Sequence, residues 1–127
     1  MFHFLSKDLV IEMHDDEIRS YGGSLGFLNE SLLDSALAHP ALAMQFSNPS
    51  IYDIAAIYGY HICKNHAFSD GNKRTAVAAM LVFLKINGHD VHALRNDIID
   101  VMLAVESNAM DKAQLAAWLA SVSVEAW

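Results

Sequence analysis

One short segment combines most of the side chains that chemistry on a phosphorylated ligand requires. It is the run HAFSDGNKRT, from His66 to Thr75. The run places an imidazole, a carboxylate, a glycine, a carboxamide and two adjacent cations just before an apolar stretch that is typical of a helix. The carboxylate can bind a divalent cation, the cations and the N–H groups of a helix start can bind phosphate oxygens, and the imidazole can transfer a proton. The segment therefore indicates a site for a phosphorylated ligand.

Each residue of this segment has its own expected role. Gly71 permits a sharp turn that brings backbone N–H groups close to an anion. Arg74 offers a planar fork for bidentate phosphate binding, and Lys73 adds a compact charge beside it. Asp70 provides the hard oxygen that Mg²⁺ prefers in combination with substrate phosphates. His66 is a candidate general base, because histidine exchanges protons near neutral pH.

Structural roles are the alternative for the same residues. A histidine followed four residues later by an aspartate could be a capping pair at a helix end, and Lys73 and Arg74 could be solvated charges. Cations at a helix N-terminus oppose the helix dipole, however, so a bound anion explains them better. Phe68 alternates with polar residues and is expected to point inward as the anchor of the loop.

The rest of the sequence predicts an all-α fold. Ser6 can cap a helix that ends near Ser20, and Asn29 can cap a second helix that ends at His39-Pro40. Residues 41–50 show no clear periodicity, so they are expected to form a loop or a small hairpin.

Two apolar helices are expected to lie at the centre and to flank the motif loop. The first spans about residues 50–64 and the second about residues 73–86, and both are apolar on most sides. Val91 is expected in a short extended piece, followed by a helix over 97–105 and a last helix capped by Asp111. The pattern predicts one compact single-domain helical bundle of about six helices over residues 1–127.

Composition narrows the classes of function. The charge balance of 8 − 15 = −7 disfavours DNA or RNA as a direct partner, because such binding relies on clustered cations. The longest apolar run, Ala76 to Leu84, is far shorter than the roughly 20 residues that span a bilayer, and MFHFLSKD is not typical of a secretory signal. The single cysteine, Cys63, excludes an internal disulfide and is expected in the core. These features predict a cytoplasmic protein with no membrane partner.

The segment HAFSDGNKRT resembles the signature of the Fic/Doc family. That signature reads His, any residue, Phe, any residue, an acid or Asn, Gly or Ala, Asn, and then two further residues of which the second is Arg. The segments HDDEIRSYGG and GFLNESLLDSAL are similar to the N-terminal half of death-on-curing (Doc) toxins. The resemblance covers nearly the whole chain and implies that His66 is the base, that Asp70 binds Mg²⁺, and that Asn72, Lys73 and Arg74 contact the phosphates of ATP.

Within the family, the sequence Asn72-Lys73-Arg74 resembles Doc more than the AMP-transferring Fic enzymes. Those enzymes usually carry a second Arg three positions beyond the first, where this chain has Val77, which cannot bind phosphate. The resemblance to Doc implies transfer of the γ-phosphoryl group of ATP to a hydroxyl of translation elongation factor Tu, which blocks translation. Transfer of AMP to a protein hydroxyl stays open, because Gly71 is the residue of the AMP-transferring branch.

The resemblance also implies a protein inhibitor. The inhibitory motif of many Fic proteins is not matched by Met102–Ser107, the nearest approach to it, so inhibition from outside the chain is expected. Doc-like toxins are held by an antitoxin whose disordered tail folds into a groove on the toxin. The negative net charge favours a tail with some positive charge.

Two other classes of function stay open. A metal-dependent phosphohydrolase could use His14-Asp15 as metal ligands together with His61 and Asp70, although this assignment leaves Asn72 and Arg74 without a role. His14 is more simply explained by a hydrogen bond in the core. The other class is a non-catalytic module whose loop only holds a nucleotide or a partner.

Overall fold

Six α-helices and one pair of short strands form the fold of residues 2–126, the part of the chain that the computed structural model describes. The strands pair antiparallel, with Asp90 opposite Val124. In chain order the elements are α1 (Lys7–Tyr21), α2 (Glu30–Phe46), α3 (Ile51–Asn65), α4 (Asn72–Ile86), β1 (His89–Val91), α5 (Arg95–Glu106), α6 (Lys112–Val122) and β2 (Ser123–Glu125).

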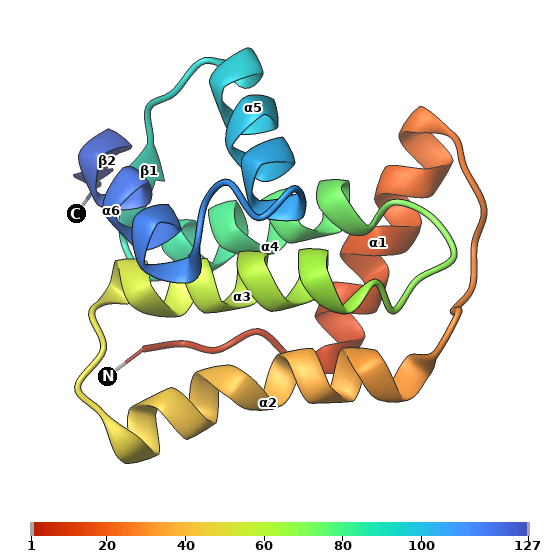
Figure 1. The fold of residues 1–127 in the computed structure, drawn as a ribbon, viewed down its shortest axis with the longest axis horizontal. Helices are drawn as coiled ribbons and strands as arrows, with labels where there is room; N and C mark the ends of the chain where they lie inside the picture. Colours follow the sequence, from red (N-terminus) through yellow and green to blue (C-terminus); the bar gives the residue numbers. More distant parts are fainter. Residues whose placement is uncertain (1, 127) are drawn as a thin grey trace.

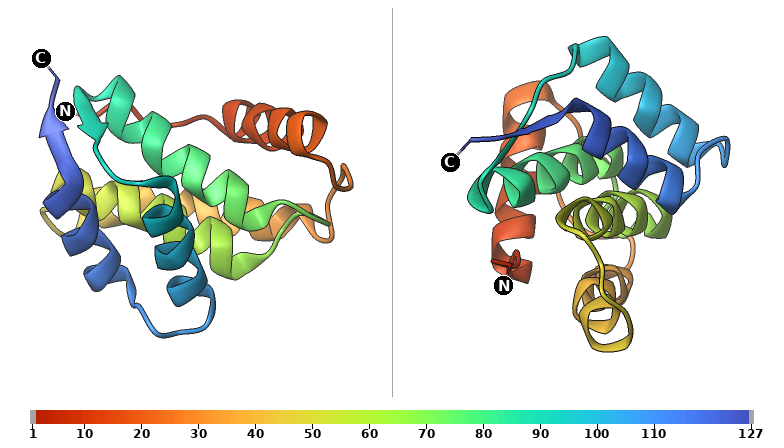
Figure 2. Two further views of the ribbon diagram at one scale, coloured as in Figure 1. Left: turned by 90° about the horizontal axis from the view of Figure 1, so that it is seen from above. Right: turned by 90° about the vertical axis from the view of Figure 1, so that its left-hand side faces the viewer.

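Helices α3 and α4 lie side by side at the centre of the fold (Figure 1). Helix α3 also packs against α2 and α6, and α1 packs against α4 (Figure 2). Gly59 of α3 allows this close approach, since a Cβ atom at that position would overlap the side chain of Met80 on α4. The prediction of two buried helices on either side of the motif loop is therefore confirmed.

Polar side chains at the helix starts determine where several helices begin. Ser6 and Asn29 each accept a hydrogen bond from a backbone N–H of the first turn that follows, in α1 and α2 respectively. Asp111 and Gln114 form a reciprocal capping box at the start of α6. These contacts confirm the predicted caps, because they satisfy N–H groups that have no partner within the helix.

The predicted loop or small hairpin over residues 41–50 was wrong for residues 41–46, which are helical, whereas residues 47–50 lie outside the helices as expected. Helix α2 continues through Pro40 and ends at Phe46, where Ser47 caps it with a bond from its N–H to the Ala43 carbonyl. Pro40 is buried on the same stripe as Leu33 and Ala36, which faces the core. Packing of that stripe, together with good helix formers in the sequence ALAM that follows, outweighs the backbone hydrogen bond that proline removes.

One hydrophobic cluster joins the elements. It includes buried residues from all six helices, and Cys63 and Phe68 both belong to it, as the sequence predicts. Three polar side chains are buried with it: His14, Asn72 and Thr75. All three lie at or near the motif loop, so the polar chemistry of the interior gathers at one end of α4. Within residues 2–126, none of the helices combines the length and the apolar character needed to cross a membrane.

A pair of histidines joins α2 to α3 away from that loop. The rings of His39 and His61 stack with centroids 3.6 Å apart, and Nζ of Lys112 on α6 lies 3.1 Å from Nε2 of His61. The ring of Tyr60 packs edge-on against His61. Burial of the ring first, and then the neighbouring His39 and Lys112, lower the pKa of His61 to about 4.

The lowered pKa of His61 predicts that the folded protein loses stability in mild acid. The unfolded chain binds a proton at His61 near the usual pKa of 6.5, but the folded chain does so only near 4. Between pH 6.5 and pH 4 the unfolded state binds more protons than the folded state. The free energy of unfolding that is present above pH 6.5 therefore decreases as the pH falls toward 4. His61→Gln should lessen the fall in urea midpoint between neutral pH and mild acid. The control His92→Gln changes an exposed histidine and should show the same fall in urea midpoint as the wild type. An equally large fall in His61→Gln would contradict the assignment of this pH dependence to His61.

Candidate active site

The loop between α3 and α4 is a tight bend with a left-handed residue at each end. His66 ends α3 with φ 53°, and Gly71 precedes α4 with φ 77°. The left-handed region is uncommon for residues with a Cβ atom, and here it carries the His66 backbone out of the helix with its side chain exposed. At the other end, a Cβ atom on Gly71 would lie 3.0 Å from Cδ1 of Ile18.

Phe68 fixes the middle of this bend. Its ring is 1% exposed and lies between two others, with centroid distances of 3.8 Å to the stacked ring of His14 and 5.1 Å to that of Phe27. Asn72 clamps the backbone of Phe68 from both sides, since its Oδ1 accepts from the Phe68 N–H at 3.1 Å and its Nδ2 donates to the Phe68 carbonyl at 3.0 Å. The predicted inward anchor is confirmed.

His14 holds the next part of the loop. Its Nε2 lies 2.7 Å from the carbonyl oxygen of Asp70 and, because a carbonyl can only accept, Nε2 is the donor. Its Nδ1 lies 3.0 Å from Oδ1 of Asp15. The predicted core hydrogen bond of His14 is therefore confirmed, and its partner is the backbone of a predicted site residue. The signal in the sequence was the adjacent pair His14-Asp15.

The carboxylate of Asp70 lies half-exposed above the start of α4. Its Oδ1 accepts a hydrogen bond from the Gly71 N–H at 2.8 Å and lies 3.9 Å from Nη2 of Arg74. The chain connecting α1 to α2 passes close by, and a Cβ atom on Gly23 would lie 2.6 Å from Asp70 Oδ2. Gly23 was not among the predicted site residues, whereas the structure makes it a neighbour of the Asp70 carboxylate.

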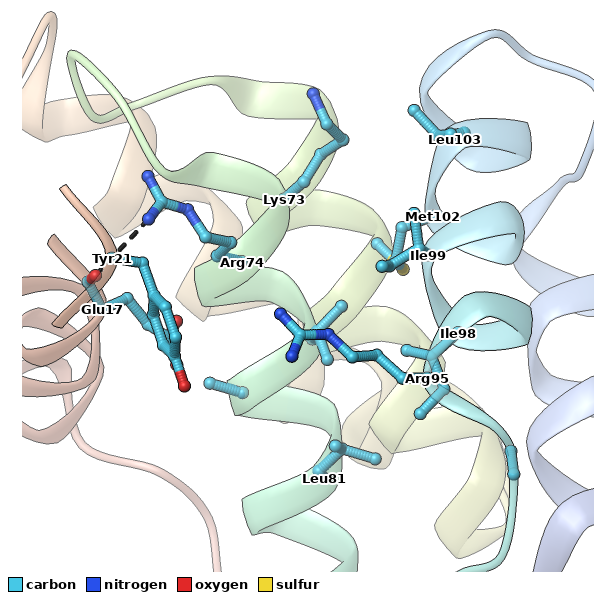
Figure 3. A pocket seen from close by; sticks show the side chains of 13 residues that line it. Glu17, Tyr21, Lys73, Arg74, Leu81, Arg95, Ile98, Ile99, Met102 and Leu103 are labelled. Atoms are coloured by element: carbon cyan, nitrogen blue, oxygen red, sulfur yellow. Dashed lines mark hydrogen bonds between the residues drawn. The ribbon is translucent and has the colours of Figure 1, made fainter. Parts of the chain in front are cut away.

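The two cations of the motif point to different partners. The guanidinium of Arg74 donates to the carbonyl of Gly22 at 3.1 Å and to that of Glu17 at 3.4 Å, the second bond being the dashed line in Figure 3. These carbonyls belong to the C-terminal end of α1, which carries negative partial charge. Lys73 instead pairs with Glu106, the last residue of α5, with 2.8 Å between Nζ and Oε2.

The first turn of α4 supplies backbone donors beside these cations. The first hydrogen bond within this helix runs from the Thr75 N–H to the Gly71 carbonyl at 2.9 Å. The N–H groups of residues 72–74 precede it and have no partner inside the helix, and the N-cap Gly71 has no side chain to cap them. Such a helix start favours an anion.

All six predicted site residues line a single pocket of about 170 Å³. Ser69 and Glu106 also line it and were missed by sequence reasoning. Glu106 had a weak signal, because an acid in the last turn of a helix opposes the helix dipole. Its closeness to the motif depends on how α5 packs. The lining residues are His66, Ser69, Asp70, Gly71, Asn72, Lys73, Arg74 and Glu106.

The side chain of Asn72 has a different role from the phosphate contact that was expected. Its side chain is only 4% exposed, and both polar ends of the carboxamide are bound to Phe68. The side chain thus supports the loop, and a phosphate contact by this residue would come from its backbone N–H.

The ligand set suggested for a metal-dependent phosphohydrolase is not brought together. His61 faces His39 and Lys112, and both nitrogens of His14 lie against oxygen atoms of residues 15 and 70. Across residues 2–126, no three His, Cys, Asp or Glu side chains form a group able to hold a metal ion.

A larger groove of about 580 Å³ adjoins the pocket and shares Lys73 and Arg74 with it (Figure 3). Its walls are mostly apolar side chains of α4 and α5, and the side chain of Arg95 extends into the groove from the start of α5. The charged lining consists of three cations and Glu17, a local balance of 3 − 1 = +2. Two of these cations have acidic partners beside the groove, because Lys73 pairs with Glu106 and Arg74 lies 3.9 Å from Oδ1 of Asp70. Within residues 2–126, Arg95 is therefore the lining cation without an ion pair.

Parts of this chain are similar to known proteins. A sequence model described as the Fic/DOC family matches residues 4–84. The chain is 42% identical to "Toxin Doc" of Mycolicibacterium smegmatis over 71 residues, which are 54% of this chain and 55% of that protein. It is 28% identical to "Protein kinase doc" of Escherichia phage P1 over 88 residues, which are 68% and 70% of the two chains.

The match spans about half the length of the mycobacterial relative. The family model, however, covers α1 to α4 and includes the loop that carries the pocket. With that loop anchored by Phe68 and all its polar residues around one pocket, the chain belongs to the Fic/DOC family.

Proposed function

We propose that this protein is a Doc-type toxin that transfers the γ-phosphoryl group of ATP to a hydroxyl of a target protein. The observation that carries the proposal is the single pocket in which an exposed imidazole, a carboxylate, two cations and a helix N-terminus meet. Phosphoryl transfer consists mainly of positioning and charge stabilisation, and this pocket contains the groups for both. The name "Protein kinase doc" of the phage relative supports the same class of reaction.

Each group has one task in this reaction. Residues 72–74 bind phosphate oxygens through their backbone N–H groups, and Lys73 and Arg74 stabilise the charge. His66 accepts the proton of the attacking hydroxyl. The hydroxyl oxygen forms the new bond to the γ-phosphorus, the bond from that phosphorus to the bridging oxygen breaks, and ADP leaves with the electron pair.

Asp70 is suited to bind Mg²⁺ together with the nucleotide. One half-exposed carboxylate plus phosphate oxygens is the kind of donor set that Mg²⁺ takes, because this ion keeps several of its waters. When bound, Mg²⁺ would neutralise developing charge on the phosphates. Asp70 is oriented for this by the His14 bond to its carbonyl and by the Gly71 N–H.

Transfer of the γ-phosphoryl group is favoured over transfer of AMP. Val77 occupies the position of the second Arg of the AMP-transferring enzymes, and it lines the apolar groove with Ala78 and Leu81. This groove side of α4 thus adds no charge beyond Lys73 and Arg74 for orienting a triphosphate. Elongation factor Tu is the target implied by the family resemblance, and modification of this target would require the toxin to be in the cytoplasm.

Intact-mass analysis of elongation factor Tu tests the reaction. Incubation with this protein, Mg²⁺ and ATP should add the mass of one phosphoryl group to the factor. His66→Ala should slow the modification by about 10² to 10⁴, the usual range for loss of a general base.

Three other outcomes would replace the proposal. Addition of AMP would assign the chain to the other branch of the family. Release of phosphate from a small ester, abolished by His14→Ala, would indicate the phosphohydrolase. If Arg74→Ala removed toxicity while no nucleotide gave a modified protein, the loop would serve binding alone.

The neighbour of the Asp70 carboxylate gives a second test. Gly23→Ala should displace that carboxylate, because the new methyl would lie 2.6 Å from Oδ2, and activity should fall by up to about 100-fold. Gly26→Ala is the matched control, since Gly26 also has positive φ but nothing within 4 Å of the added Cβ. Mg²⁺ titrations of the kinase reaction with the two variants separate the effect of backbone strain from the effect of displacing the Asp70 carboxylate. Equal losses of activity in the two variants would contradict the role of Asp70.

The adjoining groove suits the tail of an antitoxin. The name of the mycobacterial relative, "Toxin Doc", supports such a partner, and the family resemblance implies an antitoxin tail that folds into a groove. Arg95 revises the expected charge of the tail, because within residues 2–126 it is the lining cation without an acidic partner, whereas Lys73 pairs with Glu106 and Arg74 lies near Asp70. We therefore expect an amphipathic segment with apolar and acidic side chains. By engaging Lys73 and Arg74, it would compete with ATP.

Charge reversal at Arg95 tests this partner. Arg95→Glu should leave a toxin that still arrests growth but needs at least several-fold more co-expressed antitoxin for neutralisation, because an acidic segment loses a cation there. Arg19→Glu, at an exposed site outside both cavities, should be neutralised like the wild type. Unchanged neutralisation of Arg95→Glu would place the antitoxin elsewhere.

A further inference from the structure

Three basic side chains from three helices meet on a part of the fold that the proposed reaction does not use. The stacked rings of His39 on α2 and His61 on α3 have centroids 3.6 Å apart, and Nζ of Lys112 on α6 lies 3.1 Å from Nε2 of His61. Helix α3 packs against both α2 and α6, which brings the three together (Figure 1). None of them lines either cavity, and all three are only partly buried, so a small solute can reach them.

No acid compensates these basic groups. The chain has 15 acidic residues against 8 lysines and arginines. Within the part of the chain that the structure describes, however, no carboxylate lies within ion-pair distance of His39, His61 or Lys112. The neighbouring acid in the sequence, Asp111, instead caps α6 by accepting from the N–H of Gln114. Lys112 is also in the first turn of α6, where a cation opposes the helix dipole.

The contacts within the cluster keep both imidazoles uncharged near neutral pH. Lys112 only donates, so Nε2 of His61 is the acceptor of its hydrogen bond and carries no proton. Burial is the main cause that lowers the pKa of each histidine, the charge of Lys112 lowers both pKa values further, and His39 also acts on His61. The remaining titratable side chain against the cluster, Tyr60, presents the edge of its ring to His61, and its centroid lies 5.8 Å from Nζ of Lys112.

We propose that His39, His61 and Lys112 form a binding site for a small oxyanion, of the kind represented by phosphate and sulfate, that is separate from the pocket at the motif loop. Oxygen atoms of the ion accept hydrogen bonds from the ammonium group and from the imidazoles, and a protonated imidazole donates from either nitrogen. A bound anion favours the protonated form of His61, so binding takes up a proton and tightens as the pH falls below neutral. The ion links α2, α3 and α6 and offsets the loss of stability expected in mild acid.

The test follows the imidazole signals of the whole protein by NMR while sodium sulfate replaces sodium chloride at constant ionic strength. Sulfate is the probe because its own charge does not change over the range of the measurement. The signals of His61 should shift saturably, and the sulfate concentration at half-saturation should fall about three- to tenfold between about pH 7.5 and about pH 5.5. The signals of His92, an exposed histidine outside the cluster, should not respond to sulfate.

Removal of the ammonium group tests its role in the site. Lys112→Gln should raise the sulfate concentration at half-saturation at least about fivefold, because the ion loses its charge-assisted hydrogen bond. Lys85→Gln is the matched control and should bind like the wild type, since it removes the same charge from an exposed lysine that pairs with Asp90 outside both cavities. His39→Gln removes one donor without touching α6; it should also weaken binding, and it keeps the test decisive if Lys112→Gln does not fold.

Three results would overturn the inference: an absent saturable response of His61, equal binding by Lys112→Gln and the wild type, and the same half-saturation at both pH values. Repeating the titration with O-phosphoserine identifies the source of the anion. Binding tighter than that of sulfate would indicate a phosphorylated side chain, and weaker binding would indicate a free ion. All of these results are independent of phosphoryl transfer at the motif loop, since none of the three residues lines that pocket.

Discussion

The candidate site depends on how the ring and backbone of Phe68 are held. The ring is buried between His14 and Phe27, while the carboxamide of Asn72 bonds to the N–H and the carbonyl of the same residue. With its middle fixed, the loop presents His66 and Asp70 to one pocket. Preorganisation of this kind lets charged groups act on a ligand without a cost of reorganisation at the moment of reaction.

Charges at helix ends connect this loop to the rest of the fold. Arg74 binds carbonyls at the end of α1, where a cation is favourable, so α1 supports the loop through both His14 and Arg74. Lys73 is unfavourable at the start of α4 and is compensated by Glu106. In the structure, both cations that could bind phosphate therefore have protein partners. A ligand exchanges these contacts rather than meeting free charges, so affinity is set by a difference between two sets of interactions.

Much of the fold could be predicted because its signals are local. Side chains such as Ser6 and Asp111 cap the first turn of the helix that they precede, and the apolar character of α3 and α4 indicates burial. Pro40 was misread because its local effect is to end a helix, whereas its effect here depends on packing. The stacking of His39 on His61 could not be predicted, because it depends on the positions of two helices.

By itself the sequence determined the helical class, the location of the candidate site in residues 66–74 and the identity of six of the eight residues that line its pocket. Those properties follow from side-chain type and short spacing, which the chain carries wherever it folds. Only the tertiary structure decided that Asn72 supports the loop, that Glu106 faces Lys73 and that an acidic chain has a groove lined with cations. The last two features arise between residues far apart in the chain, and the packing of α1 and α5 against α4 sets the distances that govern them. The bonds of Asn72 to Phe68 span only four residues, but they depend on the burial of Phe68 between His14 and Phe27.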